Sequence, residues 1–240
     1  FLGGDDPAAQ QEFAKHLLTA SILSAPAAII CAKILYPETE KVDEKLDIDK
    51  ETIGNGPLEA ISNGTTDGIK LAVNVGGMIL VFLAFIAMIN FFLFDIIGNY
   101  TGLNETIAAA TIYDGLNLQM ILGYIFAPLA WVIGIDSQDM ILSGQLLGEK
   151  TVINEFIAYL SLKEMITADG GAMLTNRSVV ILTYALCGFS NFASIGIQIG
   201  GISSLAPNQR GTLAKLGMRA LIGGTLACLM TATIAGMLFA

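Results

Sequence analysis

Long apolar segments separated by shorter polar ones dominate this chain. A helix needs about 20 predominantly apolar residues to cross the hydrocarbon core of a bilayer. Residues 17–36, 71–97 and 220–240 meet that length. The apolar segments are rich in Ala, Leu and Gly and show no period-two alternation, so they predict helices rather than strands. The pattern therefore predicts an all-α polytopic membrane protein.

Residues 115–135 form an uncharged segment of a different kind. They include Tyr124, Pro128 and Trp131, and aromatic residues of this kind are enriched where a membrane meets water. We therefore expect a helix that lies along the membrane surface instead of crossing it.

Two further apolar segments are interrupted by polar residues. Residues 138–163 hold two half-length apolar pieces around a polar tip at Glu149–Lys150, with Asn154–Glu155 inside the second piece. Residues 178–209 carry no charge, yet a polar, glycine-containing stretch at 188–194 breaks them in the middle. Irregular backbone survives at membrane depth only where protein buries it or where it lines a cavity. The first segment predicts a re-entrant hairpin, and the second predicts a discontinuous transmembrane helix.

The charged residues indicate boundaries and orientation. The predicted parts are a transmembrane helix with its preceding loop (1–36), an acidic cytoplasmic loop (37–70), a transmembrane helix followed by the interfacial helix (71–137), the re-entrant hairpin (138–163), the discontinuous helix (164–209) and the final helix (210–240). Lys and Arg gather in 37–70 and 206–219, which the positive-inside rule places in the cytoplasm. We expect a multi-pass protein of the cytoplasmic (inner) membrane.

Composition supports a membrane protein and argues against other classes. Of the 240 residues, 54% are hydrophobic and 14% charged, whereas a soluble domain carries about 25% charged residues. The net charge of -9 comes largely from the acidic loop and does not indicate a nucleic-acid partner. Cys31, Cys187 and Cys228 lie in apolar stretches without metal-ligand spacing to one another or to His16, so neither disulfides nor a metal site is expected. The chain opens with Phe1 and a Gly-Gly-Asp-Asp-Pro loop, which predicts no signal peptide and an upstream half before Phe1.

Glu155 is the residue most indicative of function. A carboxylate at the bilayer centre costs about 2.5–3.5 kcal/mol on insertion scales, so it needs a partner or a ligand. It either forms a structural pair with Lys150 or lies at the membrane surface, or it binds a ligand from the interrupted segment beside Asn154. Asn191 and Ser194 are three residues apart and share a face if that segment is helical. They serve either packing between helices or a site where two broken helices meet.

Catalytic motifs do not accompany these residues. The sequence contains no His-Glu-x-x-His, no Gly-x-Ser-x-Gly and no P-loop. An intramembrane enzyme with Glu155 as acid or base needs a second catalytic group at depth, and neither a buried His nor a paired Asp is found. The chain is therefore not expected to be an enzyme. A purely structural subunit and a transporter of some other solute or ion remain alternatives.

Several segments resemble one known family, in the same order along the chain. The two most specific are Lys150-Thr-Val-Ile-Asn-Glu-Phe-Ile-Ala-Tyr159 and Ala185-Leu-Cys-Gly-Phe-Ser-Asn-Phe-Ala-Ser-Ile-Gly-Ile197. The others are Ala25-Pro-Ala-Ala to Ala32-Lys33 with Pro37-Glu-Thr-Glu40, Leu71-Ala-Val-Asn-Val-Gly76, Leu122-Gly-Tyr-Ile-Phe-Ala-Pro-Leu-Ala130 and Ser204-Leu-Ala-Pro207. The sequence resembles the C-terminal part of the concentrative nucleoside transporters over essentially its whole length. One departure is Ser190, where the family often has Ala.

The resemblance implies an inverted-repeat fold and a homotrimer, with the helix from residue 71 and the interfacial helix in a static scaffold. It also implies that Glu155, Asn191 and Ser194 bind the ribose of a nucleoside, while Phe189 and Leu71 line the site near the base. Such a role is chemically reasonable, because an ionised carboxylate accepts hydrogen bonds from ribose hydroxyls and each contributes about 1.5–3 kcal/mol.

In the family, the hairpin that contacts the base and the coupling-ion site both lie upstream of the segment that resembles this chain. The implied activity is nucleoside import driven by an ion gradient. Sodium is the expected coupling ion by family frequency, and a proton is the alternative. No other cofactor is implied.

Overall fold

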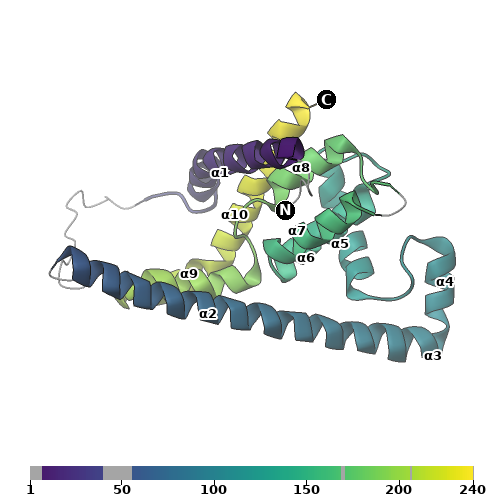
Figure 1. Ribbon diagram of the computed structural model, residues 1–240, viewed down its shortest axis with the longest axis horizontal. Coiled ribbons are helices and arrows are strands. Elements are labelled where there is room, and N and C mark those ends of the chain that lie inside the picture. Colours follow the sequence, from purple (N-terminus) through teal and green to yellow (C-terminus); the bar gives the residue numbers. More distant parts are fainter. Residues whose placement is uncertain (1–6, 40–55, 169–170, 206, 240) are drawn as a thin grey trace.

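The computed structural model describes residues 7–39, 56–168, 171–205 and 207–239, and within these ranges it contains helices and no strand (Figure 1). The elements are α1 (Pro7–Leu35), α2 (Pro57–Asn90), the π-helix η2 (Phe91–Gly98), α3 (Asn99–Thr101), α4 (Leu103–Ala110), α5 (Leu118–Val132), α6 (Met140–Val152), α7 (Glu155–Ile166), α8 (Asn176–Leu186), α9 (Phe192–Leu205), the 3-10 turn η3 (Pro207–Gln209) and α10 (Arg210–Leu238). The all-α class predicted from the sequence is confirmed.

Helices of membrane-spanning length and hydropathy occur three times in the described ranges, at Pro7–Leu35, Leu83–Thr101 and Arg210–Leu238. The first and last of these, α1 and α10, pack antiparallel. The His16 ring lies 5.0 Å from the ring of Phe239 between centroids, and Leu35 reaches Gly223 at the opposite end of the pair. The positive-inside assignment requires Lys-bearing and Arg-bearing ends on one side, and this antiparallel arrangement is compatible with it.

The helix predicted over residues 71–97 is part of a much longer element. Pro57 starts α2 at a position where its missing N–H costs nothing, and η2 continues the helix to Gly98. Asn90, the last residue of α2, connects this helix to the start of α5. Asn90 Nδ2 donates to Gln119 Oε1 (3.0 Å), and Asn90 Oδ1 accepts from the Leu118 N–H (2.8 Å). Figure 1 shows α2 running along one side of the whole chain.

The predicted surface helix corresponds to α5, which has 15 residues and is shorter than the roughly 20 that a span requires. It packs directly on α6. A Cβ built on Gly144 of α6 would lie 2.6 Å from the backbone nitrogen of Ala127, so the two helix backbones touch at this glycine. Small residues permit such close approach between membrane helices.

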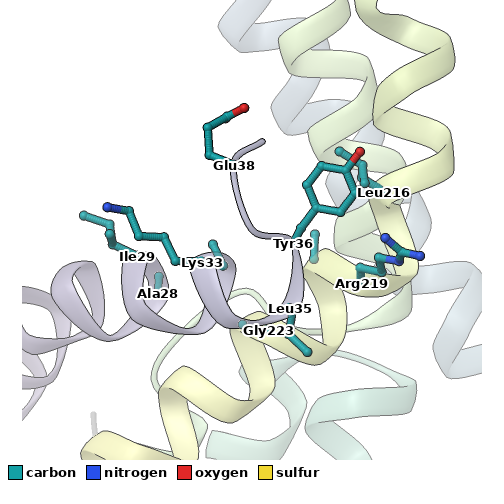
Figure 2. A pocket seen from close by; sticks show the side chains of 12 residues that line it. Ala28, Ile29, Lys33, Leu35, Tyr36, Glu38, Leu216, Arg219 and Gly223 are labelled. Carbon is teal, nitrogen blue, oxygen red and sulfur yellow. The ribbon is translucent and has the colours of Figure 1, made fainter. Parts of the chain in front are cut away.

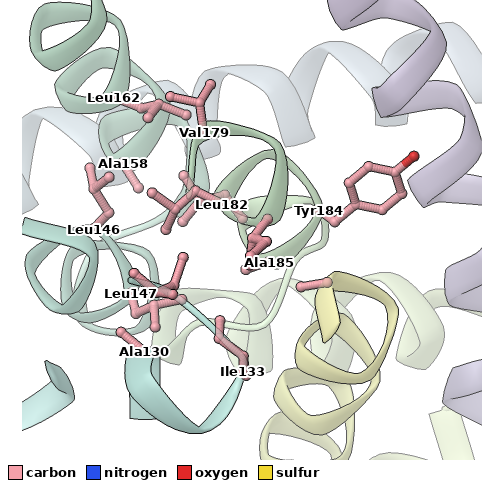
Figure 3. Packing of buried hydrophobic residues seen from close by; sticks show 14 of the residues in the cluster. Ala130, Ile133, Leu146, Leu147, Ala158, Leu162, Val179, Leu182, Tyr184 and Ala185 are labelled. Atoms are coloured by element: carbon pink, nitrogen blue, oxygen red, sulfur yellow. The ribbon is translucent and has the colours of Figure 1, made fainter. Parts of the chain in front are cut away.

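A core of leucines and alanines holds the hairpin α6–α7 against α8 (Figure 3). Leu146 of α6, Leu162 of α7 and Leu182 of α8 are completely buried, and Ala158 and Ala185 fill the space between them. Packing of this kind gives the hairpin a fixed position on α8.

Polar contacts fix the base of the hairpin. Asp139 is 3% exposed, and its Oδ2 accepts from both the N–H (3.0 Å) and the hydroxyl (2.8 Å) of Thr175, just before α8. Arg177 donates to the Gly134 carbonyl at 2.6 Å and forms an ion pair with Asp136 at 3.4 Å. The base of the hairpin is therefore tied to the start of α8, while its tip lies near the end of that helix.

Candidate functional site

The tip of the hairpin lies at Ile153–Asn154, between α6 and α7. Asn154 is the N-cap of α7, and its Oδ1 accepts from the Ile157 N–H at 2.9 Å. Glu155 is the first residue of α7 and is partly buried.

The sequence-based placement of the polar tip at Glu149–Lys150 is wrong. Helix α6 continues to Val152, so both residues lie in its last turn. Each is 2% exposed.

The discontinuous helix breaks between Leu186 and Phe192, around Asn191. Gly188 has a φ of 130°, a conformation that residues with a side chain rarely adopt. Asn191 and Ser194 then start α9 with a reciprocal cap. The Ser194 N–H donates to Asn191 Oδ1 at 2.7 Å, and the Asn191 N–H donates to Ser194 Oγ at 3.3 Å. The sequence-based idea that these two residues share a helical face is therefore replaced by a cap at a helix start.

The two interrupted segments meet at a carboxylate. Asn191 Nδ2 donates to Glu155 Oε2 at 2.9 Å, and Asn191 is 2% exposed. The N-termini of α7 and α9 converge here, and each helix start carries roughly +0.5 of a charge on its unsatisfied N–H groups. Anions are favoured at such positions. Glu155 is thus stabilised by two helix starts and one amide instead of by a cation.

Lys150 does not form the structural pair with Glu155 that the sequence left open. Its Nζ donates to the Ala185 carbonyl of α8 at 2.7 Å. Glu155 takes part in neither of the ion pairs Lys70–Asp67 and Arg177–Asp136.

Phe189 and Ser194 line one hollow of about 340 Å³ between α9 and α10. Phe189 lies in the break and is 69% exposed, so its ring is available to a ligand. Leu71, which the sequence also indicated, belongs to α2, but its side chain lies outside the described residues. The structure therefore brings Glu155, Asn191 and Ser194 together and places Phe189 next to them.

A larger hollow of about 740 Å³ lies elsewhere, between the end of α1 and α10 (Figure 2). Its wall is mostly apolar and includes Lys33, Tyr36 and Arg219, with the Arg219 guanidinium carbon 5.4 Å from the centre of the Tyr36 ring. Glu155, Asn191, Ser194 and Phe189 are not among the residues that line it. Size alone does not make it the functional site, because the convergent polar groups are at the hairpin tip.

Sequence reasoning missed a buried polar chain behind the hairpin tip. The Tyr113 hydroxyl donates to Gln145 Oε1 (3.1 Å), and Gln145 Nε2 donates to Glu149 Oε1 (3.0 Å). The spacing of Gln145 and Glu149, four residues apart on one helix, was a usable signal. No group of three or more His, Cys, Asp or Glu suited to a metal ion occurs among the residues that the structure describes, and Cys31, Cys187 and Cys228 are free thiols.

A helical membrane protein with a re-entrant hairpin and a discontinuous helix, whose interruptions meet at a polar centre, belongs to the class of secondary transporters. Comparison with known proteins narrows this class. Residues 16–236 match the family described as "Na+ dependent nucleoside transporter C-terminus". The chain belongs to this family, that of the concentrative nucleoside transporters, and its fold is their inverted-repeat fold.

Individual relatives agree with this assignment. An uncharacterized transporter of Haemophilus influenzae is 42% identical over 225 residues, which cover 92% of this chain and 51% of that protein. The nucleoside permease NupC of Helicobacter pylori is 36% identical over 222 residues, covering 92% of this chain and 50% of the permease. The structure of CNTnw in an inward-facing substrate-bound state superposes with a TM-score of 0.76 at 37% identity, covering 92% of this chain and 49% of that one.

The chain thus spans about half the length of these relatives. Membership of a transporter family also decides against the alternative of an intramembrane enzyme that uses Glu155 as its acid or base.

Proposed function

We propose that this chain supplies the ribose-binding half of a transporter that imports nucleosides by secondary active transport. One observation carries the proposal: the hydrogen bond of 2.9 Å between Asn191 and Glu155, which joins the hairpin tip to the broken helix. The name of the matching family and the name of the Helicobacter permease both support a nucleoside as the substrate.

A ribose suits the chemistry of this centre. Its hydroxyls are donors, and an ionised carboxylate is an acceptor at both oxygens. Asn191 occupies one side of Glu155 Oε2, which leaves acceptor capacity on a carboxylate that is still partly exposed. Ser194 has a small hydroxyl that now donates to the Asn191 carbonyl at 2.6 Å and is able to turn toward a ligand. A neutral sugar thereby gives the carboxylate hydrogen-bond partners without a second charge.

The base lies on the side of Phe189 and Leu71 in this proposal. The exposed Phe189 ring borders the hollow that Ser194 also lines, and aromatic rings stack on the flat face of a base. The hairpin that reads the base, and the site of the coupling ion, belong to the part of the transporter upstream of Phe1. Sodium is the proposed coupling ion, which the name of the matching family supports.

A homotrimer in the cytoplasmic (inner) membrane completes the proposal. The bacterial relatives support that membrane. The long helix α2 exposes large apolar side chains such as Val73, Leu80 and Phe85, and surfaces of this kind are covered by lipid or by other protein.

The test is Glu155→Gln in the full-length transporter, with nucleoside binding measured by calorimetry. The variant keeps the size of the side chain and removes the charge. Hydrogen bonds to a charged group contribute about 1.5–3 kcal/mol, so we expect binding to weaken by about 10- to 100-fold or more. Glu164→Gln, on the exposed side of the same helix α7, is the matched control and should bind normally. Wild-type affinity in Glu155→Gln would remove this carboxylate from the site.

A further inference from the structure

The end of α8 poses a problem that any interrupted membrane helix shares. The last four carbonyl groups of a helix have no partner within it, and the bilayer core offers no water to replace that partner. In α8 these carbonyls belong to Thr183, Tyr184, Ala185 and Leu186. The groups that donate hydrogen bonds to these carbonyls therefore stabilise the interruption after α8.

Two of the donors come from the hairpin. The Tyr159 hydroxyl of α7 donates to the Thr183 carbonyl at 2.8 Å. Lys150 Nζ of α6 donates to the Ala185 carbonyl at 2.7 Å. The backbone itself supplies a third, from the Cys187 N–H to the Tyr184 carbonyl at 3.2 Å.

Just past the helix end, α10 contributes as well. The Cys228 thiol donates to the Cys187 carbonyl at 3.1 Å. Because α8 ends at Leu186, its last carbonyl groups have no N–H donor from a following helical turn. Side chains of the hairpin and of α10 donate hydrogen bonds there instead.

Lys150 is an unusual donor for a buried helix carbonyl. It is 2% exposed, and an amino group is far more costly to bury than a hydroxyl. A cation is nevertheless favoured at a helix C-terminus, where the carbonyls carry partial negative charge. The hairpin therefore presents a cation, Lys150, to the end of α8 and an anion, Glu155, to the start of α9.

We propose that Lys150 and Tyr159 are positioning residues for the sugar site, and we call their bonds to Ala185 and Thr183 the hairpin clasp. The clasp sets how far the hairpin tip lies along α8, and this distance places Glu155 opposite Asn191. Neither residue touches the ligand. The proposal rests on the function proposed above, because it assigns Glu155 and Asn191 to the ribose.

The test compares a nucleoside with its 2′,3′-dideoxy analogue in the full-length transporter. Tyr159→Phe deletes the hydroxyl and keeps the ring, and Lys150→Met keeps the length of the side chain and removes the charged donor. We expect each variant to weaken nucleoside binding about tenfold and to leave binding of the analogue within about twofold. Lys150→Arg keeps a charged donor and should recover much of the loss.

The matched controls are Tyr124→Phe on α5 and Lys215→Met on α10, both at exposed positions. A variant that only loosens the fold weakens both ligands equally, so equal losses overturn the proposal, and so does no loss at all. If Lys150→Met does not fold, Tyr159→Phe decides the question alone. A wild-type protein that binds both ligands equally contradicts the ribose assignment itself. A wild type that discriminates, with variants that discriminate between the two ligands as strongly as the wild type does, contradicts the clasp alone.

Discussion

At the scale of single residues, one side chain of the candidate site has two structural roles. Asn191 caps α9 with its oxygen and reaches Glu155 with its nitrogen. Both ends of its amide are therefore occupied, which fixes the orientation of the amide. Because one side chain both caps α9 and contacts Glu155, the start of α9 cannot shift without changing the surroundings of Glu155.

How far single residues were predictable depends on where their partners lie. Glu155 stood out because a carboxylate in an apolar segment needs a partner. Lys150 was placed at a polar tip, whereas it is buried against α8, because the carbonyl it binds belongs to a helix 35 residues further along the chain. Sequence spacing reveals partners three or four residues apart, but it does not reveal an unpaired carbonyl on another helix.

Sugar hydroxyls should account for much of the affinity, if Glu155 and Asn191 bind the ribose. We predict that 2′,3′-dideoxynucleosides bind the full-length transporter much more weakly than nucleosides. Loss of the hydroxyls leaves buried polar groups without partners, at about 1–3 kcal/mol each. Competition binding with both ligands measures the difference, and equal competition would contradict the assignment.

At the scale of elements, the hairpin and the broken helix were predictable as interruptions, and so was the break of the helix around Asn191. The turn of the hairpin was misplaced. Short apolar pieces around polar residues indicated both. The turn at Ile153–Asn154 lies later than predicted because Glu149 and Lys150 are stabilised inside α6, Glu149 by Gln145 and Lys150 by Ala185. Burial of charged groups in a helix depends on such tertiary partners, and the sequence alone does not show them.

The break in α8–α9 depends on Gly188 in a way that can be measured. A Cβ at this position would lie 2.9 Å from Cys228 Sγ, in a backbone conformation with a φ of 130°. We predict that Gly188→Ala destabilises the protein by about 1–3 kcal/mol, seen as a lower melting temperature in detergent and weaker nucleoside binding.

Gly196→Ala is the matched control for this substitution. Gly196 lies inside α9, and nothing comes within 4 Å of a Cβ built there. Alanine is the better helix former by about 1 kcal/mol, so this variant should be as stable as the wild type or more stable. Equal melting temperatures for Gly188→Ala and the wild type would mean that the break tolerates a side chain.

At the scale of the whole molecule, the chain spans about half the length of the transporters that it matches. The matched segments cover 92% of this chain but about half of each relative, and transporters of this class place the substrate at the interface of two repeats. We predict that the 240-residue chain alone does not transport nucleosides in liposomes, even if it inserts. The residues that the structure describes include one hairpin and one broken helix, whereas alternating access needs a second set of elements for these to move against.

An uptake assay with an ion gradient tests this directly, with the full-length transporter as the positive control. Ion-driven accumulation by the isolated chain would show that the site is complete within these residues. The proposed division between a sugar half and a base half would then be wrong.

The length of α2 links the site to the thickness of the membrane. The uncharged residues 71–94 extend about 36 Å at about 1.5 Å per residue, whereas the hydrocarbon core is about 30 Å thick. A helix whose apolar stretch exceeds the thickness of the core accommodates the difference by tilting, kinking or locally thickening the bilayer. Asn90 binds the start of α5, and α5 touches the hairpin at Gly144. A change in the tilt of α2 would therefore reach the hairpin, which connects the thickness of the bilayer to the position of the hairpin tip.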